Sequence, residues 1–187
     1  MIEVEVKARA QKDTADKIVG LGAVLLGTEN HHDLYFNSPL RDFKVSDEAL
    51  RIRIKEDGAH LTYKGPKLDR KTKSRRELTV KIDSPQEMEA ILSSLGFFLS
   101  AEVCKCRTKY SYGDVIIALD EVAGLGSFLE LEARGESDWG VQAKKVLDLL
   151  KSLDLGESIR SSYLELLAEK LQENAGNGLI KNHNGQI

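Results

Sequence analysis

The chain lacks any long hydrophobic run, since no stretch approaches the roughly 18 consecutive apolar residues that a membrane-spanning helix needs. Its first residues alternate between charged and apolar types, whereas a secretory signal would place a basic segment before an apolar core. We therefore expect no membrane partner and a cytoplasmic location. Cysteine is scarce too: Cys104 and Cys106 stand one residue apart, with no further Cys or His nearby at a metal-ligand spacing. Both are expected to be buried or half-buried free thiols.

An excess of positive charge is also absent. The sequence has 27 basic and 30 acidic residues, a net charge of -3, whereas general nucleic-acid binders are usually strongly basic. Nucleic acid is therefore not an expected partner. Lys and Arg are frequent within residues 51–81, while carboxylates gather elsewhere, around Glu3, Glu5, Asp120, Glu130 and Glu132. Acids and bases brought together in one cavity would suit a substrate that carries phosphates and bound cations.

Common phosphate-binding and catalytic motifs are missing. No G-x-x-x-x-G-K-[ST] loop occurs, and Gly124-Leu125-Gly126 lacks the third glycine and the following helix of a dinucleotide site. No Ser/His/Asp arrangement stands out. The histidines show no zinc spacing, and ordinary surface or strand positions are expected for all four, His31, His32, His60 and His183.

The length of 187 residues suits one ordinary domain, or one domain built from two similar halves. With 41% hydrophobic and 30% charged residues, the composition is that of a soluble globular protein. Alternating patterns predict strands at 2–9, 23–37, 48–56, 59–66, 75–83, 97–111, 114–121 and 127–133. Amphipathic patterns and capping signals predict helices at 13–21, 85–95, 138–153 and 161–173.

The two halves of the chain resemble each other weakly. The segment Glu3-Val4-Glu5-Val6-Lys7 aligns with Glu77-Leu78-Thr79-Val80-Lys81, and Leu21-Gly22 aligns with Leu95-Gly96 at the same offset. Two such halves could pair about a pseudo-twofold axis and close a barrel, although short matches also arise by chance. Residues 175–187 are rich in Asn and Gly, so we expect a domain over residues 1–174 followed by a disordered tail.

Charged and apolar residues alternate in strand after strand. In the first strand the charged side chains share one face and the apolar ones the other, because successive residues of a strand point to opposite sides. The same alternation returns at Arg51, Arg53 and Lys55, at Thr62 and Lys64, at Glu77, Thr79 and Lys81, at Lys105, Arg107 and Lys109, and at Glu130 and Glu132. For any one strand, a sheet with one face in water explains the pattern. For the whole set, we favour helices covering the apolar side, so that the charged side lines a closed or nearly closed barrel.

A charged interior is costly unless its charges neutralise one another or bind a ligand. A triphosphate with divalent cations would satisfy both signs at once. Arg and Lys side chains would grip phosphate oxygens, and carboxylates would hold Mg²⁺ or Mn²⁺, which prefer oxygen ligands. The alternation therefore predicts a metal-dependent triphosphate-binding cavity.

An ordered series of motifs over about residues 1–170 resembles the CYTH superfamily of class IV adenylate cyclases and thiamine triphosphatases, also called triphosphate tunnel metalloenzymes. The matching motifs are Glu3-x-Glu5-x-Lys7, Leu50-Arg51-Ile52-Arg53, Thr62-Tyr63-Lys64-Gly65-Pro66, Arg75-Arg76-Glu77, Lys105-x-Arg107 and the run from Leu119-Asp120 to Glu130-Leu131-Glu132. The resemblance implies an α+β fold: a closed eight-stranded antiparallel β-barrel, or tunnel, with a charged interior and helices packed outside. It also implies metal-dependent chemistry on triphosphates.

The resemblance implies roles by motif position. It implies triphosphate contacts from Lys7, Arg51, Arg53, Lys64, Lys105 and Arg107. It implies binding of Mg²⁺ or Mn²⁺, directly or through water, by Glu3, Glu5, Asp120, Glu130 and Glu132. Its candidate catalytic residues are Glu3, Glu5, Lys7, Glu77, Lys105 and Arg107. Glu77 could instead pair with a neighbouring arginine.

Three segments are most similar to the class IV cyclase branch, namely Asp120–Gly126 with Phe128 and Glu130, Asp33-x-Tyr35-Phe36, and Ser162-Tyr163-x-x-Leu166-Leu167. This similarity implies conversion of ATP to cyclic AMP and pyrophosphate. Triphosphatases acting on tripolyphosphate, thiamine triphosphate or a nucleotide share most of the charged set, so a triphosphatase is the alternative. A non-catalytic binder of triphosphate or polyphosphate is a second alternative. A homodimer is compatible with the exposed parts of the strands and helices.

Overall fold

The computed structural model describes residues 2–68, 75–134 and 138–180, and side chains within residues 4–68, 75–134 and 138–173. The eight strands are β1 (Ile2–Arg9), β2 (Val24–Asn37), β3 (Ala49–Lys55), β4 (Gly58–Lys67), β5 (Arg75–Ile82), β6 (Phe98–Tyr112), β7 (Val115–Val122) and β8 (Gly126–Ala133). The four helices are α1 (Thr14–Gly20), α2 (Pro85–Ser94), α3 (Trp139–Ser152) and α4 (Tyr163–Ile180). These bounds lie within two residues of the predicted ones except at the end of α4.

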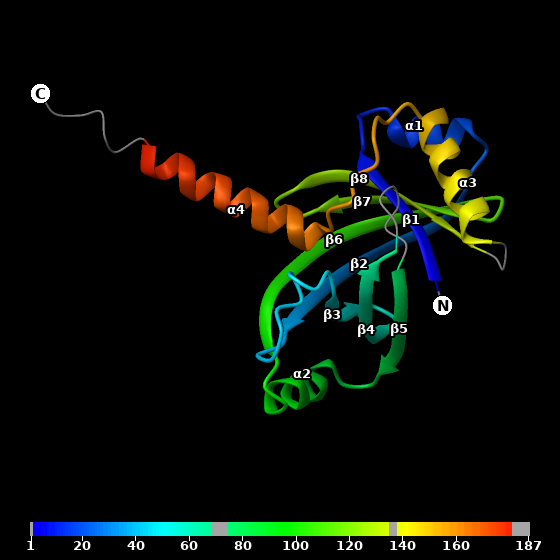
Figure 1. Cartoon of the computed structure of the whole chain (residues 1–187). Coiled ribbons are helices and arrows are strands. Elements are labelled where there is room, and N and C mark those ends of the chain that lie inside the picture. Colours follow the sequence, from blue (N-terminus) through cyan, green and yellow to red (C-terminus); the bar gives the residue numbers. More distant parts are fainter. Residues whose placement is uncertain (1, 69–74, 135–137, 181–187) are drawn as a thin grey trace, which may run out of the picture.

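The last helix continues to Ile180, whereas the sequence predicted an end near residue 173. Residues 181–187 of the predicted tail, with His183, lie outside the described residues. Figure 1 shows α4 projecting away from the sheet, with only its first turns next to the strands.

All eight strands are antiparallel to their neighbours, in the order β1-β5-β4-β3-β2-β6-β7-β8. The predicted closed barrel is confirmed only in part. Among the described residues, β1 pairs with β8 through six residue pairs but with β5 only through Ile2–Arg76 and Glu3–Arg75. Beyond these two pairs β1 follows β8 and β5 follows β4, so the edges diverge. The sheet is a half-barrel that pairs across its open side along one short seam (Figure 1).

The order of elements repeats along the chain. Strand, helix and three strands occur from β1 to β4 and again from β5 to β8. Exchanging each strand for its counterpart in the other half leaves the pairing order of the sheet unchanged. This is the arrangement that a duplicated half would produce.

Helices cover the apolar side of the sheet, as the alternation predicted. One core places Val4, Val6 and Leu131 of the strands against Val146 and Leu150 of α3. A second core packs strands β2 to β5 against α2, whose Leu92 is buried. Figure 1 shows α1 and α3 together at one end of the sheet and α2 at the other. The charged side is therefore the concave one.

A third, unpredicted core lies on the concave side. Tyr163, at the start of α4, packs with Phe128, Val103 and Val122 of the sheet, and the Phe128 and Tyr163 rings meet edge to face at 5.1 Å between centroids. Ser162 caps the helix, since its Oγ accepts from the backbone N–H of Glu165 at 3.1 Å. The first turns of α4 therefore close one side of the half-barrel.

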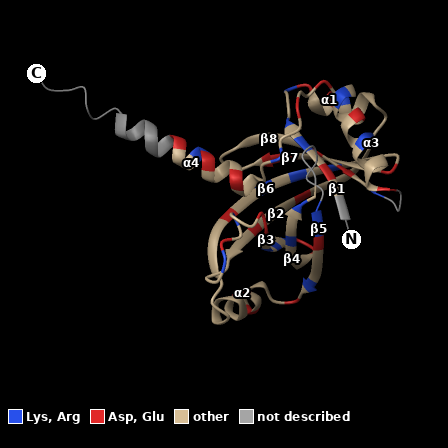
Figure 2. Cartoon of the chain, viewed as in Figure 1, with Lys and Arg blue, Asp and Glu red and all other residues tan. Residues whose placement is uncertain are grey.

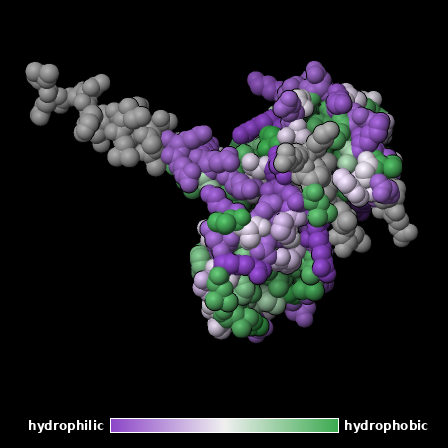
Figure 3. All heavy atoms as spheres, viewed as in Figure 1, coloured by the Kyte–Doolittle hydropathy of each residue, from purple (hydrophilic) through white to green (hydrophobic). Residues whose placement is uncertain are grey.

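Apolar residues are exposed around α2, where Figure 3 shows hydrophobic surface at the lower end of the molecule. They include Ile91, Leu95, Phe98 and Leu99. The predicted homodimer stays a prediction. Both cysteines are free, as expected, but they are exposed and not buried or half-buried, because they alternate with Lys105 onto the outer face of β6. Within the described part of the chain, α-helices of the length and apolar character needed to span a bilayer do not occur.

Candidate active site

The concave side of the sheet holds a cavity of about 350 Å³. Figure 2 shows that basic and acidic positions both occur along the strands of the half-barrel. Nine of the twelve predicted site residues line the cavity: Glu5, Arg51, Arg53, Lys64, Glu77, Lys105, Arg107, Glu130 and Glu132. Lys7 and Asp120 are fully buried beside it, and the side chain of Glu3 lies outside the described residues.

Asp33 of β2 holds the two arginines of β3. It lies opposite Arg53 in the register and accepts two hydrogen bonds from that guanidinium, both at 2.7 Å, while Arg51 Nη1 lies 3.9 Å away. Burial alone would raise the pKa of Asp33, but the Arg53 hydrogen bond and both guanidinium charges hold it well below its usual range. The ionised carboxylate fixes both arginines toward the cavity.

Asp120 of β7 joins three donors. Its carboxylate accepts from Lys105 Nζ at 2.8 Å, from Arg107 through two bonds of 2.6 Å, and from the Tyr163 hydroxyl at 2.9 Å. The Arg107 and Lys105 charges lower the pKa of Asp120 although burial opposes them. Burial, followed by the Arg107 charge, lowers the pKa of Lys105 to about 8. Asp120 therefore anchors cations here, and its role as a metal ligand stays a prediction.

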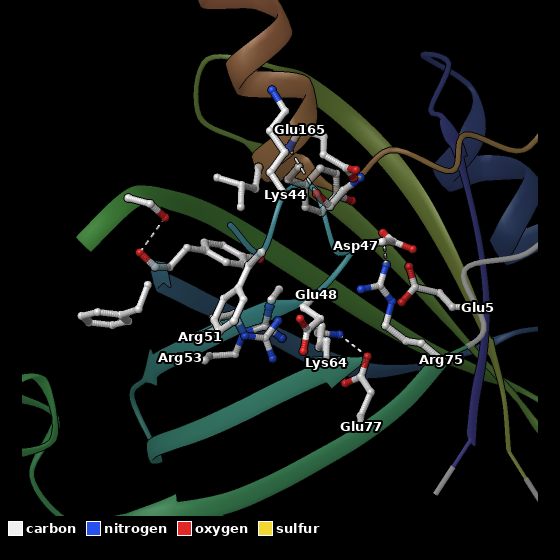
Figure 4. A pocket seen from close by; sticks show the side chains of 18 of the residues that line it. Glu5, Lys44, Asp47, Glu48, Arg51, Arg53, Lys64, Arg75, Glu77 and Glu165 are labelled. Carbon is white, nitrogen blue, oxygen red and sulfur yellow. Dashed lines mark hydrogen bonds and ion pairs between the residues drawn. The ribbon is translucent and has the colours of Figure 1, made fainter. Parts of the chain in front are cut away.

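The remaining predicted cations also have counter-charges or aromatic neighbours. Arg107 bonds Glu130 as well as Asp120, and Lys64 bonds Glu77 across the β4–β5 pair. The Lys7 ammonium lies 4.1 Å from the centroid of the Tyr163 ring, a cation–π contact. Figure 4 shows Arg51, Arg53 and Lys64 together, with Glu77 beside Lys64.

Three carboxylates gather where β1 meets β8. Glu5 lies directly opposite Glu132, and Glu130 is two residues away on the same face of β8. Burial, with the Glu5 charge, raises the pKa of Glu132 although Arg134 opposes this. The oxygen donors suit Mg²⁺ or Mn²⁺, and a cation would relieve their repulsion. Among the described residues, no three acidic, His or Cys side chains already converge as a metal site, so these carboxylates would have to close around an ion.

Glu132→Gln is expected to stabilise the metal-free protein by up to about 1 kcal/mol. The folded protein raises the pKa of this carboxyl, so the ionised form is disfavoured and the destabilisation is present above the folded pKa. Melting temperatures in a chelator at pH 8 and pH 5 measure the effect, which should shrink at pH 5. Glu169→Gln, at an exposed position of α4, is the matched control. An equal or lower melting temperature at pH 8 would contradict the expected repulsion.

One wall of the cavity is aromatic and apolar. It is formed by Tyr35, Phe36, Phe43, Leu164 and Ala168, from β2, the following loop and α4. At the rim, Lys67 Nζ lies 2.6 Å from Asp47 and 3.6 Å from Glu165 of α4. Figure 4 shows Asp47 and Arg75 facing each other beside Glu5. The cavity thus combines a charged end with an apolar wall.

Residues 1–163 match the CYTH domain. The chain is a member of the CYTH family. Membership indicates an enzyme family that acts on triphosphates with divalent metal ions. A curated protein of Methanocaldococcus jannaschii, named provisionally as an adenylate cyclase, is 39% identical over 173 residues, covering 89% of this chain and 98% of the relative.

Two solved structures extend the comparison. A protein of Pyrococcus horikoshii OT3 is 40% identical with a TM-score of 0.85, covering 90% of this chain and 99% of the other. A Hippeastrum protein, described as a provisional adenylyl cyclase with a dominant triphosphatase activity, has a TM-score of 0.68. It is 22% identical and covers 90% of this chain and 96% of its own. At that identity it shows a shared fold.

Sequence reasoning missed three polar residues of β2 that lie beside the cations of this CYTH site without lining the cavity themselves. They are Glu29, His31 and Asp33, which alternate onto the concave face opposite Arg107, Lys105 and Val103 of β6. The charged alternation of β2 was the available signal, but it is interrupted by a neutral imidazole. Asp33 was used only as a mark of the cyclase branch, although its place opposite Arg53 gives it a direct structural role.

Proposed function

We propose that the protein is a divalent-metal-dependent enzyme that converts ATP to cyclic AMP and pyrophosphate. The observation that carries the proposal is the pairing, in one cavity, of the cation set with an aromatic and apolar wall. The cations suit a triphosphate, and Tyr35, Phe36 and Phe43 offer a place for a purine. The name of the Methanocaldococcus jannaschii relative supports this assignment.

In this reaction the ATP 3′-hydroxyl loses its proton to solvent and its oxygen bonds to the α-phosphorus, while the bond from that phosphorus to the oxygen bridging to the β-phosphate breaks. Arg51, Arg53 and Lys64 would hold the leaving pyrophosphate by charge-assisted hydrogen bonds. Lys105 and Arg107 would stabilise the charge that develops on the phosphates. Mg²⁺ or Mn²⁺, held by Glu5, Glu130 and Glu132 with Glu3 and Asp120 as further candidates, would supply charge neutralisation and a lowered hydroxyl pKa.

A triphosphatase is the second candidate. The same cations would hold tripolyphosphate, thiamine triphosphate or a nucleotide while water attacks the terminal phosphorus. The dominant triphosphatase activity described for the Hippeastrum protein favours this alternative. The two activities would differ in the register of the phosphates along the cavity.

Product analysis separates the candidates. The purified protein is incubated with ATP, tripolyphosphate or thiamine triphosphate, each with Mg²⁺ or Mn²⁺. Cyclic AMP with pyrophosphate is the expected result. Orthophosphate without cyclic AMP would overturn the cyclase proposal in favour of the triphosphatase, and binding without turnover would favour the non-catalytic binder.

Arg51→Ala is expected to weaken tripolyphosphate binding about 10- to 100-fold, the scale of a lost hydrogen bond to a charged group. Arg51 is only 9% exposed, and its Nε atom is buried without a hydrogen-bond partner among the described residues, as for a group that awaits an anion. Calorimetry without metal measures the affinity. Arg76→Ala, which removes an exposed cation that does not line the cavity, is the control. Equal affinity in Arg51→Ala would remove Arg51 from the phosphate site.

A further inference from the structure

His31 lies beside Arg53, Lys105 and Arg107 of the cation set, on the concave face of β2. Its side chain is 2% exposed, and it is directly opposite Lys105 in the β2–β6 register, where side chains of a pair are neighbours. Its Nε2 atom lies 2.8 Å from Glu29 Oε1. The next residue, His32, points to the outer face, is 43% exposed, and makes an equivalent 2.8 Å contact with Glu102. Neighbouring imidazoles with similar partners thus occupy opposite sides of the sheet.

The contact with Glu29 determines which nitrogen of His31 carries the proton. Although burial opposes it, hydrogen bonds from His31 and Lys109 lower the pKa of Glu29 to about 2, so this carboxylate is ionised. An ionised carboxylate only accepts, and the proton of the neutral imidazole therefore lies on Nε2. The Nδ1 atom is left as an acceptor. It is buried and has no hydrogen-bond partner among the described residues.

The charged groups that face His31 come from three strands: Glu29 and Asp33 of β2, Arg53 and Lys55 of β3, and Lys105, Arg107 and Lys109 of β6. Burial, followed by the Arg53 and Lys105 charges, lowers the pKa of His31 to about 4, against the Glu29 hydrogen bond. Without a bound anion the imidazole is therefore neutral near pH 7. It presents a lone pair, not a donor, beside three cations that repel a further positive charge.

We propose that His31 is a further phosphate-binding residue, which takes up a proton from solvent when an oligophosphate occupies the neighbouring cations and then donates Nδ1–H to a phosphate oxygen. The inference rests on the proposed function, because it requires the anion to bind this cation set. The anion removes the repulsion from Arg53, Lys105 and Arg107 and supplies the acceptor that a protonated Nδ1 needs. Without the anion, the cations disfavour a protonated imidazole. With the anion bound, its negative charge outweighs this repulsion and favours the protonated form.

The direct test follows the two imidazoles by NMR in the metal-free, full-length protein with labelled histidine. Without ligand, the His31 signals should titrate near pH 4. With saturating tripolyphosphate the midpoint should rise by about three pH units, to near 7, each unit being a tenfold change in proton affinity. His32 on the outer face should keep its midpoint, and the loss of one signal in His31→Gln assigns the resonances.

Affinity provides the second measurement. At pH 6, His31→Gln should bind tripolyphosphate about tenfold more weakly than the natural protein, whereas at pH 8 the two affinities should be similar, because His31 is then neutral in both states of the natural protein. His32→Gln, as matched control, should behave as the natural protein at both values. Comparing proteins with the same ligand cancels the titration of the phosphate itself.

The outcomes separate the inference from the proposed function. Tight tripolyphosphate binding with an unmoved His31 midpoint overturns the inference and leaves the proposed function standing. Absence of tripolyphosphate binding overturns both. The NMR titration needs only the natural protein, so it decides the question even where His31→Gln does not fold.

Discussion

Replacing Glu130 by glutamine is expected to reduce metal-dependent turnover at least roughly 100-fold. Substituting a residue that only hydrogen-bonds to a metal ligand already lowers metal affinity or activity about 10- to 100-fold. Glu130 is 7% exposed, lines the cavity, and lies two residues along β8 from the Glu5–Glu132 pair. Glutamine keeps the shape of the side chain and an oxygen acceptor for Arg107 but removes the charge that a divalent ion needs. Turnover is measured over a range of Mg²⁺ and Mn²⁺ concentrations.

The fold of Glu130→Gln should be preserved, which circular dichroism and melting can verify. Glu121→Gln changes an exposed carboxylate of β7 outside the cavity and should keep full turnover. Metal-free tripolyphosphate binding by Glu130→Gln should persist, because the cations remain. Undiminished turnover in this variant would exclude Glu130 from the metal site.

Asp120→Ala is expected to destabilise the protein by about 3–5 kcal/mol, the range for removing one partner of a buried ion pair. The substitution leaves Lys105, Arg107 and the Tyr163 hydroxyl without their shared acceptor, in a position where the Asp120 side chain is fully buried. It would also loosen α4, because Tyr163 begins that helix. Urea unfolding at pH 7 measures the free energy of unfolding.

The loss should depend on pH in a defined direction. Since the folded protein lowers the pKa of Asp120, its stabilisation is present above the unfolded value and is lost as the pH falls. The difference between the two proteins should therefore shrink toward acid. Asp148→Ala, which breaks the exposed Lys144–Asp148 pair of α3, should leave the free energy of unfolding nearly unchanged. A similarly small loss in Asp120→Ala would mean that the three donors find other partners.

Much of the cavity could be predicted because the alternation of a strand is a property of the backbone itself. Once Arg51 and Arg53 are placed on one strand, they must share a face with each other and oppose Ile52. The charged face had to be the one turned away from the helices, since α3 and α2 require an apolar surface to cover. The order of the CYTH motifs then indicated that distant strands contribute to one site, although the sequence does not give the register between those strands.

What the sequence did not reveal depends on contacts between distant segments. Tyr163 lies 43 residues from Asp120 along the chain, and no local pattern indicates that its hydroxyl reaches that carboxylate. The short β1–β5 seam depends on how far the sheet curls, which is determined by the whole set of strand pairs. His31 was interpreted as an ordinary strand residue because the importance of an imidazole comes from the charges that surround it.

The ion pairs between cations and carboxylates of the cavity affect how its two ligands bind. Arg107 is ion-paired with Glu130. The Glu130 carboxylate therefore competes with a phosphate for Arg107, and Arg107 competes with a metal ion for Glu130. Either ligand, on binding, releases the partner that the other requires. Metal and triphosphate should therefore bind synergistically. By linkage, each must raise the affinity of the other by the same factor, whichever is titrated first.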